Sequence, residues 1–126
     1  MQGLAPNLMV EDVQKTINYY EKVLGFEVLL KTPEQELPVW ALVQNGNVAI
    51  MFQQRKSFEK EYAHMKDRAL GGSLSFFIKV ESVDTLYNTI KDQANIIKEP
   101  HITSYNMKEF AIEDCNGYLL VFAQDQ

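Results

Sequence analysis

The chain has 126 residues, 46% of them hydrophobic, and a net charge of −5 at neutral pH. This length predicts one domain that buries a core without disulfides or a structural metal. The acidic balance argues against nucleic-acid binding, which favours a basic surface. Cys115 is the single cysteine, and the sequence shows neither a membrane-length apolar run nor a basic leader. We therefore expect a cytoplasmic protein without nucleic-acid or membrane partners.

The first part of the chain predicts a strand, a helix and three further strands. Residues 4–10 alternate as a strand does, and apolar residues then recur at helical spacing from Val13 to Leu24, before Gly25. Strands are predicted at 26–30, 39–43 and 48–52, the last two joined by a hairpin turn at 44–47. The order of elements is therefore βαβββ.

The next segment, residues 55–72, is rich in charged side chains. Phe58, Tyr62 and Met65 recur at helical spacing within it, and Gly71 and Gly72 end it. This pattern predicts a mostly exposed connecting helix.

The rest of the chain repeats the first pattern. Strands are predicted at 73–80, 95–98, 108–112 and 118–123, with a helix from Ser82 to Ile90 and a break at Pro100. The two patterns align at a constant shift of 70 residues, so that residues 10–13 correspond to residues 80–83. The predicted organisation is one domain, 1–126, with module 1 at 1–54, a connector helix at 55–72 and module 2 at 73–126.

Two motifs carry a resemblance to a known family. They are Asn7–Val13 followed by Tyr19–Phe26 (YYEKVLGF), and Glu109–Phe122 (EFAIEDCNGYLLVF). Together they resemble the glyoxalase / bleomycin resistance protein / extradiol dioxygenase family, the vicinal oxygen chelate superfamily. The resemblance implies an α+β fold in which two βαβββ modules form a cup of curled sheets. Ligands bind inside this cup in the family, and a partner chain often completes it.

Many members of the family also hold a divalent metal in the cup. The resemblance carries the four metal-ligand positions over to Ala5, Met51, Ser75 and Val121, which are again related in pairs by the shift of 70. None of these side chains is a strong ligand for zinc, iron, manganese or magnesium. We therefore predict no metal and no cofactor, as in the bleomycin-resistance branch, which binds its ligand without metal.

Strand alternation extends this assignment to neighbouring positions. Side chains at every second residue share one face of a sheet. Their alternating neighbours, such as Leu8, Ile50 and Phe122, are apolar and predicted to face the helices. The predicted ligand-binding residues are Asn7, Met9, Met51, Gln53, Ser75, Phe77, Lys79, Tyr105, Met107, Glu109 and Val121. A mostly apolar lining with a few polar groups is typical of a small-molecule pocket; alternatively, side chains fill the cup and the polar groups lie at its rim.

Four other residues have two interpretations each. His101, expected in a loop after Pro100, is a surface histidine or a ligand contact near the mouth of the cup. Cys115 is interpreted as a turn residue, because Glu113 and Asp114 disfavour a thiolate beside them. Trp40 and Phe110, at matched positions of the repeat, are expected in the core rather than against a ligand.

Two functions follow from these observations. The first is a metal-independent protein that binds a small, partly apolar molecule and forms a homodimer. The alternative is a glyoxalase-like lyase or isomerase with a non-standard or absent metal site. Its acid–base chemistry would fall to Glu109, Lys79 or His101, and the sequence identifies no catalytic residue.

Overall fold

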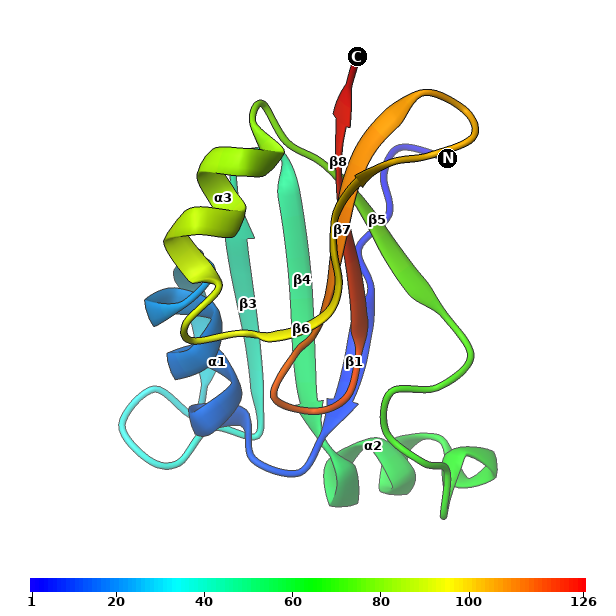
Figure 1. Cartoon of the computed structure of the whole chain (residues 1–126). Coiled ribbons are helices and arrows are strands. Elements are labelled where there is room, and N and C mark those ends of the chain that lie inside the picture. The colour runs from blue at the N-terminus through cyan, green and yellow to red at the C-terminus, as the bar shows by residue number, and fades with distance from the viewer. The chain divides into compact units, whose positions relative to one another are not determined.

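The computed structural model describes all residues from Met1 to Gln126, which form two compact units, Met1–Leu70 and Gly71–Gln126 (Figure 1). Unit 1 contains β1 (Asn7–Val10), α1 (Val13–Lys22), β2 (Glu27–Thr32), β3 (Trp40–Asn45), β4 (Val48–Gln54), α2 (Arg55–Glu61) and the 3₁₀ helix η1 (Ala63–Met65). Unit 2 contains β5 (Ser75–Lys79), α3 (Val83–Ile90), β6 (Asn95–Ile102), β7 (Met107–Glu113) and β8 (Leu119–Asp125). None of the helices combines the length and apolar character needed to cross a membrane.

Each unit holds one mixed sheet of four strands with the same topology. The strand orders are β1-β4-β3-β2 and β5-β8-β7-β6, and only the first pair in each sheet is parallel. Asn7 pairs with Met51 in the first sheet, and Phe77 pairs with Val121 in the second. These two pairs are separated by 70 residues, so the predicted duplication of a βαβββ module is confirmed.

The helices that follow β1 and β5 begin at equivalent caps. The Asp12 carboxylate accepts a hydrogen bond from the backbone N–H of Lys15 at 3.0 Å, and the Ser82 hydroxyl accepts one from Thr85 at 3.2 Å. Each cap satisfies a backbone donor that a first helical turn leaves without a partner. The two caps therefore start α1 and α3 at matched places in the repeat.

The core of each unit lies between its sheet and the helix packed on it. In unit 1 the buried ring of Tyr20 on α1 contacts those of Phe26 and Phe52. In unit 2 Phe110 is fully buried against Phe122, as expected for a core residue. We call the sheet face opposite α1 or α3 the distal face of that unit. Strand alternation places the predicted ligand-binding side chains of the strands on these distal faces.

Two predicted elements differ from the structure. The connecting helix ends at Glu61, because Tyr62 leaves the helical region with φ −131° and ψ 87°, and the short η1 follows. Strand β6 continues through Pro100 to Ile102 instead of ending before it. An edge strand tolerates proline, which cannot donate to a neighbouring strand, and the pairing with β7 shifts register between Lys98 and His101. His101 therefore lies in a strand and not in a loop.

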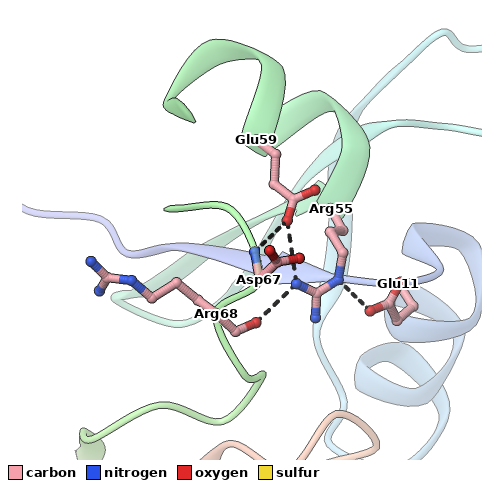
Figure 2. A network of polar contacts seen from close by, with 5 residues as sticks. All are labelled: Glu11, Arg55, Glu59, Asp67 and Arg68. Atoms are coloured by element: carbon pink, nitrogen blue, oxygen red, sulfur yellow. Dashed lines mark hydrogen bonds and ion pairs between the residues drawn. The ribbon is translucent and has the colours of Figure 1, made fainter. Parts of the chain in front are cut away.

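A polar network holds the segment after α2 (Figure 2). The Arg55 guanidinium contacts the Glu11 carboxylate at 2.5 Å and donates to the backbone carbonyl of Arg68 at 2.9 Å. It lies 3.6 Å from Glu59, whose carboxylate accepts from the backbone N–H of Asp67 at 3.0 Å. Residues on both sides of η1 are thus tied to the start of α1 through one arginine.

We expect Arg55→Gln to loosen this segment without unfolding the chain. Exposed ion pairs contribute at most about 1 kcal/mol to the free energy of unfolding, so the global change stays within that range. Hydrogen exchange at the Asp67 amide is expected to accelerate. Lys79→Gln is the matched control, because it breaks an exposed ion pair with Asp125 and should leave this amide unchanged. Equal protection of the Asp67 amide in Arg55→Gln and the native chain would contradict the role assigned to Arg55.

Candidate functional site

The distal face of unit 1 brings together the four residues predicted there. Asn7 and Met9 lie on β1 and pair with Met51 and Gln53 on β4. Residues directly opposite each other in a sheet project to the same side. Trp40, paired with Gln53, is half-buried on this face and not in the core as expected.

A chain of amide hydrogen bonds crosses this face. The Asn7 amide donates to Oε1 of Gln53 at 2.8 Å, and Nε2 of Gln53 donates to the hydroxyl of Ser57 at 2.9 Å. Oδ1 of Asn7 is buried and has no partner. Reversing both amides would leave Nδ2 of Asn7 unpaired instead, so the side chain keeps one unused hydrogen-bonding atom either way. Sequence reasoning missed Ser57, which lies four residues after Gln53, in the first turn of α2.

The distal face of unit 2 carries the second predicted group. Phe77 is 54% exposed and pairs with Val121 between β5 and β8. Ser75 and Lys79 lie on the same side of β5, and Nζ of Lys79 is 2.9 Å from the Asp125 carboxylate. Lys79 is therefore an exposed, ion-paired residue in this structure.

Glu109 is the most buried charged side chain on this face. Only 6% of its surface is exposed, and its Oε2 accepts a hydrogen bond from the Tyr105 hydroxyl at 2.6 Å. This hydrogen bond to Glu109 raises the pKa of Tyr105 above its ordinary value, because it stabilises the protonated phenol. The hydroxyl of Thr103 accepts from the backbone N–H of Met107 at 3.0 Å and fixes the turn that carries Tyr105.

His101 is the direct partner of Glu109 across β6 and β7. Its Nδ1 is 2.8 Å from the backbone carbonyl of Glu99. A carbonyl can only accept, so Nδ1 donates in this contact. The sequence did not reveal this pairing, because the extra residues in β6 hide which positions face β7.

The side chains at the four positions that the resemblance assigns to metal ligands do not suit a divalent ion. Ala5 and Val121 have no donor atom, Met51 offers a thioether, and Ser75 offers one hydroxyl. No group of three or more His, Cys, Asp or Glu side chains in the chain could hold a metal ion. His64 and Cys115 are both exposed, the first in η1 and the second in the turn between β7 and β8.

A separate pocket of about 550 Å³ lies in unit 1 between α1, β2 and the loop that follows β2. Its helix wall comes from positions spaced three and four residues apart, which form one stripe of α1. None of the predicted ligand-binding residues lines it. The lining residues are Gln14, Ile17, Asn18, Glu21, Val28, Leu29, Leu30, Lys31, Glu34 and Gln35.

Solved structures with the same fold cover nearly all of the chain. TioX from Micromonospora sp. ML1 is 17% identical, with all of both chains covered and a TM-score of 0.80. A glyoxalase/bleomycin resistance protein/dioxygenase family enzyme from Burkholderia phytofirmans PsJN is 18% identical, with 97% of each chain covered and a TM-score of 0.80. A bleomycin resistance determinant encoded on the transposon Tn5 is 18% identical over 100% of this chain and 99% of that chain, with a TM-score of 0.72.

Comparison with curated proteins gives no significant match. The sequence model of one family, by contrast, matches residues 4–122, which include both modules. This match agrees with the two motifs and with the duplicated βαβββ topology. The chain therefore belongs to the Glyoxalase/Bleomycin resistance protein/Dioxygenase superfamily.

Proposed function

We propose that this chain binds a small, partly apolar molecule without a metal, and that the molecule lies against the distal faces of its sheets. The observation that carries the proposal is the composition of these faces. The positions that the resemblance assigns to metal ligands hold Ala5, Met51, Ser75 and Val121, and the neighbouring Asn7 side chain has one amide atom, Oδ1, without a hydrogen-bond partner. Such a surface favours the binding of an organic molecule over that of an ion.

The five methionines provide a direct test of where a ligand binds. Met9, Met51 and Met107 are on the distal faces, whereas Met1 and Met65 are outside them. Bleomycin is the first compound to test, because one structural neighbour is a bleomycin resistance determinant. With ¹³C-methyl methionine, we expect saturable shifts of the Met9, Met51 or Met107 signals and unchanged Met1 and Met65 signals.

Native mass spectrometry of the purified protein extends this test beyond bleomycin. We expect a small molecule retained after mild desalting, which then serves as the ligand in the methionine experiment. Shifts confined to Met1 and Met65 would contradict the proposed position.

Metal binding gives an independent prediction. A divalent ion at the family position would lose its hydration shell without gaining anionic or imidazole ligands, which costs many kcal/mol. We expect elemental analysis of protein purified without chelators to give well below one equivalent of zinc, nickel, iron or manganese. The metal-independent proposal would be overturned by one equivalent of any of these metals that resists dialysis and is lost in Met51→Ala or Glu109→Gln.

The alternative is a lyase or isomerase of the glyoxalase type. One observation favours it: His101 and Glu109 place a ring nitrogen and a carboxylate on adjacent strands, as acid–base chemistry requires. Turnover of the hemithioacetal of methylglyoxal and glutathione, lost in both His101→Leu and Glu109→Gln, would support this function. Ligand binding without any turnover would leave the binding function as the better account.

We also propose that the chain is a cytoplasmic homodimer. Large apolar side chains remain exposed in the single chain, among them Leu4 before β1 and Leu74 before β5. Burying them in a twofold interface of more than about 1,200 Å² would give a stable dimer. Light scattering at micromolar concentration is expected to give twice the chain mass of 14.5 kDa. A single-chain mass would contradict the dimer.

A further inference from the structure

The pocket beside α1 is bordered by a free edge of the first sheet. β2 is the last strand in the order β1-β4-β3-β2, so it pairs only with β3, and the backbone groups on its outer side belong to no ladder. Residues 28–31 of this strand line the pocket, and α1 forms the wall that faces them. A groove between a helix and a free strand edge can accept an extended peptide as an additional strand.

The strand wall of this groove exposes apolar surface. The pairing of β2 with β3 shifts register between Val28 and Leu30, which leaves Leu29 without a partner on β3. Such a bulge redirects side chains at a sheet edge. Leu29 and Leu30 are 42% and 54% exposed, and the buried side chain of Ile17 on α1 belongs to the same lining. An occupant that covers the two leucines with apolar side chains removes this surface from water, which stabilises the complex.

The charged side chains of the lining are distributed unevenly along the groove. The short connection at 23–26 makes α1 and β2 run in opposite directions, so Glu21 lies toward the Val28 end and away from Lys31. Glu34 follows Lys31 by three residues and offsets its charge at the other end. Neither Glu21 nor Lys31 forms an ion pair within the chain. The Glu21 end therefore carries an unbalanced negative charge, which favours a cationic group of the occupant.

The equivalent place in module 2 shows that the fold does not require this arrangement. α1 and α3 begin at matched caps separated by 70 residues, so Lys91 of unit 2 corresponds to Glu21. Tyr87 corresponds to Ile17 in the same way. Nζ of Lys91 lies 5.9 Å from the centre of the Tyr87 ring, so this cation has a partner within its own unit. Module 1 has instead a carboxylate without such a partner, which remains available to a cation from outside the chain.

We propose that the groove between α1 and β2 binds an extended peptide segment of another protein, with a cationic side chain or amino terminus of that segment at Glu21. The peptide pairs with the free edge of β2 and covers Leu29 and Leu30 with its apolar side chains. A small apolar molecule would cover the edge without supplying hydrogen bonds to its backbone groups, whereas a peptide supplies them. The inference is independent of the proposed function, because none of the predicted ligand-binding residues lines this groove.

Three capped pentapeptides test the proposal, and the readout is the backbone amide signals of residues 28–31. The first probe is acetyl-Lys-Val-Leu-Val-Lys-amide, the second has glutamate in place of both lysines, and the third is the first with N-methylated valines. We expect the first to shift these signals saturably at concentrations up to about 10 mM, the affinity range of weak short ligands. The acidic peptide is expected to bind about fivefold more weakly. The methylated peptide should cause no saturable shift, because it lacks the donors that pair with a strand edge.

Matched variants assign the charge selection to Glu21. Glu21→Gln is expected to weaken binding of the lysine peptide about threefold, because it removes one exposed charge at the end of the groove. Glu27→Gln is the control: it removes the same charge from β2, and its side chain points away from that of Val28 to the other face of the sheet. It should change the affinity by less than about 1.5-fold at physiological salt, which screens charges beyond about 8 Å.

Several results would overturn the inference. They are the absence of shifts at residues 28–31 with the lysine peptide, equal affinity for the lysine and glutamate peptides, and equal affinity of Glu21→Gln and Glu27→Gln. Equal binding of the N-methylated peptide would show that the edge of β2 does not pair with the occupant. Concentration-dependent shifts of the same amides without any peptide would identify a second copy of the chain as the occupant instead. The methionine experiment on the distal faces decides the proposed function separately.

Discussion

Gly71→Ala is expected to destabilise the protein by roughly 3–5 kcal/mol. Gly71 is buried and has φ +89°, a conformation that side chains with a Cβ rarely adopt. An added Cβ would lie 2.6 Å from the backbone oxygen of Gly117 and 3.1 Å from its carbonyl carbon. To relieve this clash, the backbone of the turn between β7 and β8 would have to move, and hydrogen bonds to Asp114 hold that turn in place.

Gly117→Ala separates the two causes of this loss. Gly117 has φ +88°, almost the same value, but an added Cβ would meet no atom within 4 Å. Gly117→Ala is therefore expected to lower the free energy of unfolding only by the cost of the left-handed backbone conformation, about 1–2 kcal/mol. Urea denaturation followed by circular dichroism measures both variants. Equal losses would show that the contact between Gly71 and Gly117 does not limit stability.

Phe110→Ala is expected to cost roughly 3–5 kcal/mol, because it removes a fully buried ring and leaves a cavity. Its ring centroid lies 5.1 Å from that of Phe122 and 5.4 Å from that of Tyr87 on α3, so the loss affects the packing of helix on sheet. The same denaturation experiment measures the change. An unfolding free energy within about 1 kcal/mol of the native value would contradict this position in the core.

Phe77→Ala is the matched control on the other side of the same sheet. Phe77 is 54% exposed, so its removal is expected to change stability by less than about 1 kcal/mol. The proposed function gives it a different consequence, namely weaker binding of a ligand on the distal face. A stable Phe77→Ala variant with unchanged ligand affinity would argue against a role for this ring in binding.

The regular parts of this fold were predictable from short-range patterns. Alternation at period two and apolar spacing at period 3.6 indicated the strands and helices, and Asp12 and Ser82 indicated where two helices start. The shift of 70 residues predicted that Asn7 and Phe77 would occupy equivalent places, and their partners Met51 and Val121 show the same shift. The shift is not constant, because Trp40 pairs with Gln53 whereas Glu109, and not Phe110, pairs with Ala123. Periodic patterns carry this information because side-chain direction follows backbone geometry.

Irregular backbone limited the prediction for the candidate site. Proline usually ends a strand, yet β6 continues past Pro100 because it is an edge strand with register shifts. These shifts decide that His101 faces Glu109. Counting residues along the sequence does not locate such shifts, so His101 and Glu109 were predicted separately and not as a pair.

The secondary structure and the contacts between distant residues thus depend on different information in this protein. The local sequence determined the two βαβββ modules, the apolar faces toward α1 and α3, and the absence of ligand side chains at Ala5, Met51, Ser75 and Val121. Folding decided the contacts between distant residues: the amide chain from Asn7 to Ser57, the approach of Gly71 to Gly117, and the pocket between α1 and β2. The physical reason is that pairing across a sheet depends on bulges, turns and packing, which join residues that no short sequence window contains together.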